Sequence, residues 1–181
     1  NASNIVAEWP MNDGPGTLVT DTVGGNNGTM VGLDPAKAWL PGGGIRFDNL
    51  NGHHIEVPHS DTFDFGDESF TIVLQVRYLK EPTTSDLWLM KGTHGIPGTG
   101  SRYEVFQTSG DEVRFSIDNG PDNIKSKLEV PDAAFVTGEW VHVAAVRDAA
   151  NDQLSLYADG VLLGTTTDDS GDISSGEDML I

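Results

Sequence analysis

The chain has 181 residues, with 28 Asp or Glu against 10 Lys or Arg, which gives a formal net charge of −18. Nucleic acids and anionic membrane surfaces bind cationic footprints, so this balance argues against both as partners. No apolar run approaches the roughly 20 residues of a membrane-inserted helix. The chain has no cysteine, which excludes disulfides, thiolate metal sites and a cysteine nucleophile.

Alternation of apolar and polar residues, the pattern of half-buried strands, runs along most of the chain. In chain order, strands are expected at residues 4–9, 28–32, 44–49, 53–58, 69–79, 103–108, 112–118, 140–148 and 153–158. A hairpin turn is expected at Asp159-Gly160, and a short helical turn at 132–135. The pattern predicts an all-β fold, an antiparallel β-sandwich, in a single domain over residues 1–181.

Several segments, taken in order, resemble the laminin-G-like domains of the concanavalin A-like lectin/glucanase superfamily. They are "AEWPMNDGPGTLVTDTVGGNNGTM" (7–30), "GGGIRFDNLNGHHIEVPHSDTFDFGDESFTIVLQVRY" (42–78), "LMKG" (89–92) and "GEWVHVAAVRDAANDQLSLYADGVLLG" (138–164). The resemblance implies a concanavalin A-like jelly roll. It also implies a non-catalytic, lectin-like module of a larger secreted or cell-surface protein, with a polysaccharide or other glycan as its partner.

Two alternatives to a glycan-binding module stay open: an adhesion domain without glycan affinity, and a catalytic domain. Glycoside hydrolases need two carboxylates that flank the scissile bond. Glu104 stands alone in its predicted strand, and no strand carries the Glu-x-Asp-x-x-Glu cluster of the enzymatic relatives. Independent catalysis is therefore the weakest of the three. Trp140, which precedes the alternating Val141 and Val143, is expected to pack in the core.

The loop "DTVGGNNGTM" (21–30) is rich in glycine and in oxygen-bearing side chains. Glycine and asparagine tolerate positive φ, so a turn in which Asp21 caps backbone amides explains much of it. The resemblance implies a structural calcium ion as the alternative, because bacterial relatives often hold calcium in a loop of this kind. Its ligands would be the oxygens of Asp21, Gly24, Asn26 and Thr29, in keeping with the preference of calcium for oxygen.

Candidate sugar-binding residues are an aromatic side chain and the polar groups of one glycine-rich loop. Trp88 is less clearly a core residue than Trp140, and the loop "KGTHGIPGTGSRY" (91–103) carries His94, Arg102 and Tyr103. Loops on a rigid sandwich are where binding groups concentrate. A buried tryptophan and a solvated hairpin loop are the alternatives.

The residues "EDMLI" (177–181) have the pattern of the beginning of an apolar strand. Relatives continue past this point with a last strand that lies beside the first. We therefore expect the natural polypeptide to continue, and a further strand to cover an edge formed by Ile5, Ala7 and Trp9.

Overall fold

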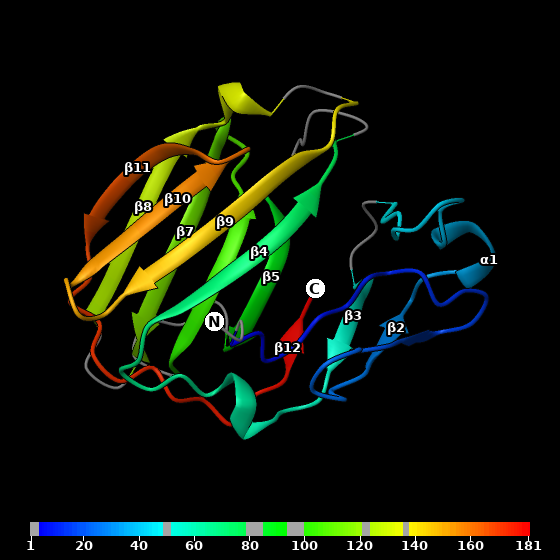
Figure 1. The fold of residues 1–181 in the computed structure, drawn as a ribbon, viewed down its shortest axis with the longest axis horizontal. Coiled ribbons are helices and arrows are strands. Elements are labelled where there is room, and N and C mark those ends of the chain that lie inside the picture. The colour runs from blue at the N-terminus through cyan, green and yellow to red at the C-terminus, as the bar shows by residue number, and fades with distance from the viewer. Residues whose placement is uncertain (1–3, 49–51, 79–84, 94–99, 121–123, 136–137) are drawn as a thin grey trace. The chain divides into compact units, whose positions relative to one another are not determined.

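The computed structural model describes residues 4–48, 52–78, 85–93, 100–120, 124–135 and 138–181. The chain divides into two compact units, and each is described by itself (Figure 1). The first unit comprises residues 1–63 and 176–181, and the second comprises residues 64–175. The single domain expected from the sequence stays a prediction.

The first unit is built on four short antiparallel strands. They are β1 (Leu18–Val19), β2 (Gly28–Val31), β3 (His54–Val57) and β12 (Met179–Leu180), in that order across the sheet. Met30 pairs with Ile55, and Met179 pairs with Val57. All four side chains are buried, so one face of this sheet forms a small apolar core. The strand expected near the end of the chain is therefore present as β12.

Two short helical segments complete the first unit. Helix α1 (Pro35–Ala38) begins after Asp34, whose side chain accepts a hydrogen bond from the Ala36 backbone N–H, as an N-cap residue does. The 3-10 turn η1 (Asp61–Phe63) buries Phe63, whose ring lies 5.8 Å from that of Trp9. The contact between half-buried Trp9 and buried Phe63 thus anchors the irregular segment that contains Trp9.

The first expected strand, at residues 4–9, is absent from the structure, where residues 4–10 adopt no regular structure. The backbone of Glu8 is bonded to the following loop instead: its C=O accepts from Thr22 N–H, and its N–H donates to the Asp21 carboxylate. The strand expected at 44–49 is reduced, over its described residues, to a bridge between Ile45 and Trp39. Both expectations were wrong because local apolar alternation cannot tell a strand from an extended segment that bonds to a loop.

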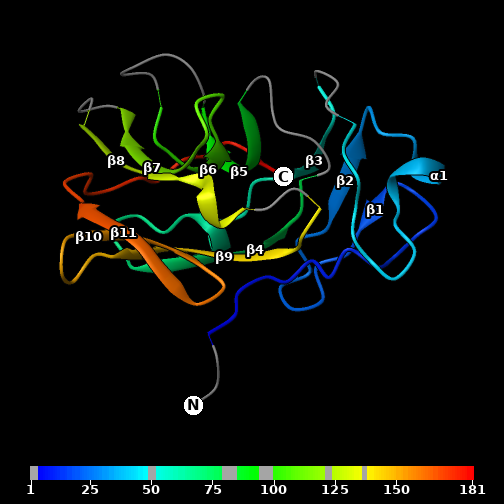
Figure 2. The ribbon, with the colours of Figure 1, turned by 90° about the horizontal axis from the view of Figure 1, so that it is seen from above.

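The second unit is a sandwich of two antiparallel sheets, which Figure 2 shows as two layers. One sheet has the order β11-β10-β9-β4 and the other the order β5-β6-β7-β8. The strands of the first are β4 (Phe70–Val76), β9 (Val141–Asp148), β10 (Gln153–Ala158) and β11 (Val161–Thr167). Those of the second are β5 (Asp86–Gly92), β6 (Arg102–Gln107), β7 (Glu112–Asn119) and β8 (Ile124–Pro131).

The turns of this unit follow the sequence signals. Asp159 and Gly160 join β10 to β11 with φ of 47° and 78°, values that favour glycine and tolerate aspartate. The 3-10 turn η3 (Asp132–Ala134) occupies the place of the expected short helix. Strands dominate the described residues, so the prediction of an all-β antiparallel sandwich is confirmed.

The sandwich core lies between the two sheets. Phe70 of β4 contacts two rings of the opposite sheet, those of Tyr103 at 5.0 Å and Phe115 at 6.3 Å between centroids. A Cβ at Gly164 of β11 would lie 2.9 Å from the Val130 side chain, so glycine permits the close approach of these strands. Each sheet therefore has an inner face in the core and an outer face turned away from it.

Trp140 does not pack in the core, contrary to the sequence expectation. It is 44% exposed, and the Arg77 guanidinium lies 4.8 Å from its ring centroid. Successive strand residues alternate between faces, and Val141 points inward. Trp140 therefore lies on the outer side of the sheet with His142, and not on the inner face with Val141.

Candidate functional site

Polar and charged side chains gather on the outer face of the β5–β8 sheet. Tyr103 and Phe115 point into the core, so the alternate residues of β6 and β7 occupy the outer face. The strand registers place these residues in three cross-strand rows. They are Gly92–Arg102–Asp118–Lys125, Met90–Glu104–Ser116–Lys127 and Leu87–Phe106–Arg114–Glu129. We refer to the polar members of these rows as the polar ladder: Arg102, Glu104, Arg114, Ser116, Asp118, Lys125, Lys127 and Glu129.

Arg102 is the centre of the polar ladder and is only 7% exposed. Its Nη2 lies 3.0 Å from Asp118 Oδ2, and its Nη1 donates to the Thr93 carbonyl at 3.2 Å. Its Nε lies 3.4 Å from Glu104 Oε1, to which the Ser116 hydroxyl donates at 2.6 Å. One buried guanidinium is therefore shared by two buried carboxylates, of which Glu104 also contacts Ser116 and lies near Lys125.

Within the part of the chain that the structure describes, two buried atoms of this cluster have no hydrogen-bond partner. They are Arg102 Nε, whose contact with Glu104 lacks hydrogen-bond geometry, and Asp118 Oδ1. Most buried polar atoms in native proteins are bonded, and an unmet one costs about 1–3 kcal/mol. One of the two atoms is a donor and the other an acceptor. A hydroxyl group can satisfy both, because it accepts and donates at the same oxygen.

The other end of the polar ladder is more exposed. Arg114 donates from both Nε and Nη2 to Glu129 Oε1, and Lys127 Nζ lies 2.8 Å from Glu129 Oε2. The hydrogen bond from Lys127, together with Arg114, holds the pKa of Glu129 below its usual value. Arg114 also lies 4.8 Å from the Phe106 ring centroid. Glu129 is thus neutralised by two cations.

Lys125 is exposed at the edge of the sheet, with its Nζ 3.9 Å from Glu104 Oε1. Burial of part of the side chain lowers the pKa of Lys125, and the Arg102 guanidinium lowers it further, whereas Glu104 and Asp118 act in the opposite direction. The side chain therefore sits close to another cation as well as to the carboxylates.

The structure separates the residues predicted to bind sugar. Arg102 lies in the polar ladder, whereas Tyr103 points into the core and is 3% exposed. Trp88 is half-buried and packs against Tyr78 and Phe135, at 5.9 and 5.6 Å between ring centroids. His94 lies outside the described residues. Sugar binding by these residues stays a prediction.

Sequence reasoning missed Asp118, Lys125 and Lys127, which share the outer face with Arg102. The signal was present in "IKSKLEVP" (124–131), where Lys125, Lys127 and Glu129 alternate with Ser126, Leu128 and Val130. A strand pairing was needed to bring these residues beside Arg102.

The loop proposed for calcium is folded around Asp21, whose side chain is buried. Its Oδ1 accepts from the backbone N–H groups of Glu8, Val23 and Gly24 at 2.9–3.1 Å. Its Oδ2 accepts from the backbone and side-chain N–H groups of Asn26 at 2.9 and 3.2 Å. Burial alone would raise the pKa of Asp21, but these backbone hydrogen bonds hold it below its usual value.

These hydrogen bonds fit a carboxylate that caps backbone N–H groups better than a carboxylate that binds calcium. A carboxylate has about four lone-pair sites, and N–H donors occupy those of Asp21. Thr29 lies in β2, paired with Leu18 and Glu56, and is exposed. Among the described residues, no three His, Cys, Asp or Glu side chains form a group that could hold a metal ion. Calcium binding stays a prediction.

We expect Asp21→Ala to lower the free energy of unfolding by about 2 kcal/mol at pH 7, since it removes hydrogen bonds to a charged acceptor. Because the folded-state pKa of Asp21 is depressed, this contribution is lost as the pH falls through that pKa. Thermal melts of the wild type and of Asp21→Ala, each with calcium and with EDTA, measure this change in stability. A calcium-dependent rise in melting temperature that Asp21→Ala abolishes would restore the calcium interpretation.

Asp86, at the start of β5, titrates in the opposite sense, because burial raises its pKa. It pairs with Gln107, whose buried Oε1 has no hydrogen-bond partner. A raised folded-state pKa means that stability increases as the pH falls. We expect Asp86→Asn to stabilise the protein by about 1 kcal/mol or less at pH 7 and to have a smaller effect at pH 4. Urea denaturation at both pH values is the measurement, with the exposed Asp169→Asn as control. An equal gain in stability at the two pH values, or no gain at pH 7, would contradict the prediction.

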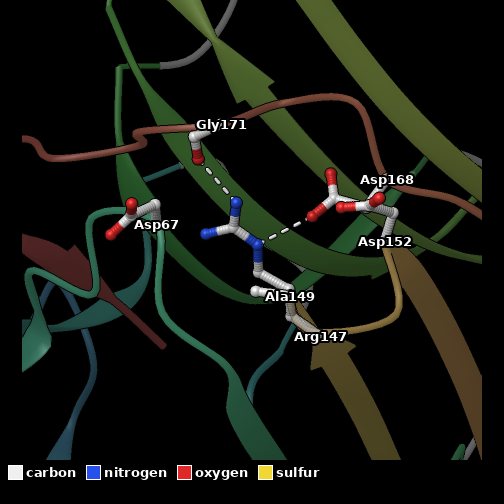
Figure 3. A pocket seen from close by; sticks show the side chains of 6 residues that line it. All are labelled: Asp67, Arg147, Ala149, Asp152, Asp168 and Gly171. Atoms are coloured by element: carbon white, nitrogen blue, oxygen red, sulfur yellow. Dashed lines mark hydrogen bonds and ion pairs between the residues drawn. The ribbon is translucent and has the colours of Figure 1, made fainter.

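A pocket of about 240 Å³ lies at one end of the β4–β9–β10–β11 sheet. Its lining includes Asp67, Arg147, Asp152 and Asp168 (Figure 3). Arg147 is 2% exposed and donates to Asp168 Oδ2 at 2.7 Å, to Gly66 O at 2.8 Å and to Gly171 O at 2.5 Å. The donors of its guanidinium are thus used in hydrogen bonds to the surrounding loops. We therefore assign the pocket a structural role.

Residues 49–181 match the family model of the concanavalin A-like lectin/glucanases superfamily. The chain belongs to this superfamily, as the resemblance of its segments indicated. A comparison with curated protein sequences gives no match. Among the described residues, no helix is long and apolar enough to cross a membrane.

Solved structures share the fold at low sequence identity. The binding domain of Paraclostridial Mosquitocidal Protein 1 is 10% identical, with a TM-score of 0.68 over 96% of this chain and 43% of that one. The binding domain of botulinum neurotoxin serotype D is 12% identical, with a TM-score of 0.66 over 98% and 42%. The CBM40 module of the Ruminococcus gnavus IT-sialidase is 22% identical, with a TM-score of 0.52 over 64% of each chain.

The match to the Ruminococcus gnavus module spans less than two thirds of that chain's length. The same module was solved with α2,3-sialyllactose bound. The similar structures include a carbohydrate-binding module and the binding domains of toxins, with which this chain shares the fold.

Proposed function

We propose that this protein is a non-catalytic glycan-binding module, and that the polar ladder is its binding face. Membership of a superfamily of lectins and glucanases supports this function. The fold shared with a module solved with sialyllactose bound is consistent with it. We further propose, as the family resemblance implies, that the module belongs to a larger secreted or cell-surface protein.

The observation that carries the proposal is the unmatched pair Arg102 Nε and Asp118 Oδ1. A sugar hydroxyl accepts from the first and donates to the second, so it completes the hydrogen bonding of the cluster. The guanidinium and both carboxylates are held by bonds within the protein before the ligand arrives, and such preorganisation lowers the cost of binding. Lys125 lies at the exposed end of the same row, opposite Asp118.

A non-catalytic role suits the same cluster. Glu104 and Asp118 are both ion-paired with Arg102, at 3.4 and 3.0 Å. A general acid must be free to give up its proton to a leaving group. Carboxylate oxygens fixed in this way accept hydrogen bonds from hydroxyl groups, which suits sugar binding.

A glycan array, followed by isothermal titration calorimetry of its hits, tests the proposal. We expect Asp118→Asn to weaken binding at least tenfold, because one oxygen acceptor becomes a donor and the ion pair with Arg102 is lost. Circular dichroism and a thermal melt establish that the variant is folded. Binding of the hits with unchanged affinity by Asp118→Asn would remove the polar ladder from the proposal, and an array without hits would contradict glycan binding itself.

An adhesion domain that binds protein is the second candidate, favoured by an apolar row on the outer face of the other sheet. Val73, Ala144, Tyr157 and Leu162 lie side by side across its four strands. Val73 is 56% exposed and Leu162 is 50% exposed. Exposed apolar patches mark protein interfaces. If Leu162→Asp changed the binding of the larger protein to its target while Asp118→Asn did not, this candidate would replace the first.

A further inference from the structure

We infer that the glycan bound at the polar ladder carries an anionic group, and that Lys125 and Lys127 bind this group. The inference rests on the proposed function and goes beyond it by naming the chemical class of the ligand. Three observations carry it: where the cations of the chain lie, which charges of the ladder reach solvent, and how the two ammonium groups are spaced.

The cations of this acidic chain are concentrated on one sheet face. The chain has only 10 Lys and Arg residues against 28 Asp and Glu. Four of those cations lie in the three rows of the polar ladder, against three carboxylates: the cations are Arg102, Arg114, Lys125 and Lys127. Glu112, opposite Pro131, lies in the next row of the same face, so the face has four cations and four carboxylates and is neutral on a protein with a net charge of −18. An anion approaching the protein is repelled least there.

Depth separates the two signs of charge within the ladder. The side chains of Glu104 and Asp118 are 1% and 8% exposed, whereas those of Lys125 and Lys127 are 36% and 44% exposed. A ligand at this face therefore meets ammonium groups first, with the carboxylates beneath them. The solvent-exposed charges of the ladder are therefore more positive, on balance, than all of its charges together.

The two ammonium groups have donors to spare and stand at a useful spacing. Lys127 has one close partner, Glu129 Oε2 at 2.8 Å, and Lys125 Nζ lies 3.9 Å from Glu104, too far for a hydrogen bond. An ammonium group has three donors, so both lysines can donate further. They are two positions apart on one strand and hence about 7 Å apart along it, on the same face. A carboxylate or sulfate between them can accept from both.

Two alternative roles, pairing with carboxylates alone and binding of a neutral sugar, do not explain why both lysines lie on this face. Pairing with the carboxylates alone needs no second exposed cation, because Arg102 and Arg114 already contact all three carboxylates. Two like charges on one face repel each other, and a bound anion removes this repulsion. A neutral sugar uses the hydroxyl site at Arg102 and Asp118 but gains nothing from Lys125 and Lys127.

The experiment compares acidic glycans with their neutral counterparts. An array that contains matched pairs gives the ranking: 3′-sialyllactose against lactose, 3′-sulfolactose against lactose, and polygalacturonate against its methyl ester. We expect the hits to be the acidic members and their affinity to fall with added salt. We expect Lys125→Met with Lys127→Met to weaken binding of an acidic hit at least tenfold by calorimetry. Lys37→Met is the matched control, because Lys37 is exposed, pairs with Asp34 and lies outside the ladder.

Each outcome decides between the two proposals. Three results would overturn the anionic class and leave glycan binding intact. The first is that all hits are neutral glycans, and the second is that wild type binds the acidic and the neutral member of a pair equally. The third is that wild type and the double variant bind an acidic hit equally. An array without any hit would overturn glycan binding itself. Binding of sulfated but not carboxylated glycans, or the reverse, supports the inference and identifies the anionic group. A tenfold loss in Lys37→Met would show that net charge, and not the ladder, governs binding.

Discussion

Substitution of Arg147 by methionine is expected to destabilise the protein by about 3–5 kcal/mol, the range for breaking a buried ion pair by removal of one partner. The side chain is 2% exposed, and its guanidinium is paired with Asp168, which is itself buried. It also holds the carbonyls of Gly66 and Gly171, which lie far apart in the sequence. Methionine keeps much of the side-chain volume but removes the charged donor, so that Asp168 keeps the hydrogen bonds from Ser170 and Gly66 O keeps that from Ile173 N–H. Urea denaturation followed by tryptophan fluorescence gives the free energy of unfolding.

The double variant Arg147→Met with Asp168→Asn separates the loss of the ion pair from the loss of packing. Removing the orphaned charge should restore part of the stability, because an unpaired buried charge is the largest cost of the single variant. Arg77→Met is the control, since Arg77 is half-exposed and contacts the Trp140 ring, an interaction worth about 0.5–1 kcal/mol at such a site. Equal destabilisation by Arg147→Met and Arg77→Met would show that the Arg147 contacts contribute little.

Arg102→Met should cost a similar amount, about 3–5 kcal/mol, for the same physical reason. Arg102 is the common partner of Glu104 and Asp118, whose side chains are 1% and 8% exposed. Its loss leaves two carboxylates without the guanidinium that neutralises them.

Arg114→Met is the matched control on the same face. Arg114 is paired with Glu129, but its side chain is 25% exposed, and Lys127 also contacts Glu129. A partly exposed pair of this kind contributes about 1 kcal/mol or less. Urea denaturation of both variants at pH 7 provides the measurement. A loss of stability in Arg102→Met that is no larger than that in Arg114→Met would contradict the account of a buried guanidinium shared by two carboxylates.

The polar ladder shows why a candidate site is harder to predict than a fold. Arg102 stood out in the sequence because it follows a glycine-rich loop, and Tyr103 stood out for the same reason. The pleat of β6 sends the two side chains to opposite faces, so only Arg102 reaches the ladder. Asp118, Lys125 and Lys127 join it through the pairing of β6 with β7 and of β7 with β8. The spacing of these residues in the sequence does not indicate which strands pair.

Local patterns determined the all-β class, most of the strands and the turns at Asp159-Gly160 and 132–135, because alternation and turn chemistry act over a few residues. The tertiary structure alone decided the rest. It fixed whether the extended segment at 4–9 pairs in a sheet or bonds to the Asp21 loop, and on which side Trp140 lies. It also brought the scattered cations of an acidic chain onto one sheet face. These outcomes depend on contacts between distant residues, whose free energies arise only when the strands are placed side by side.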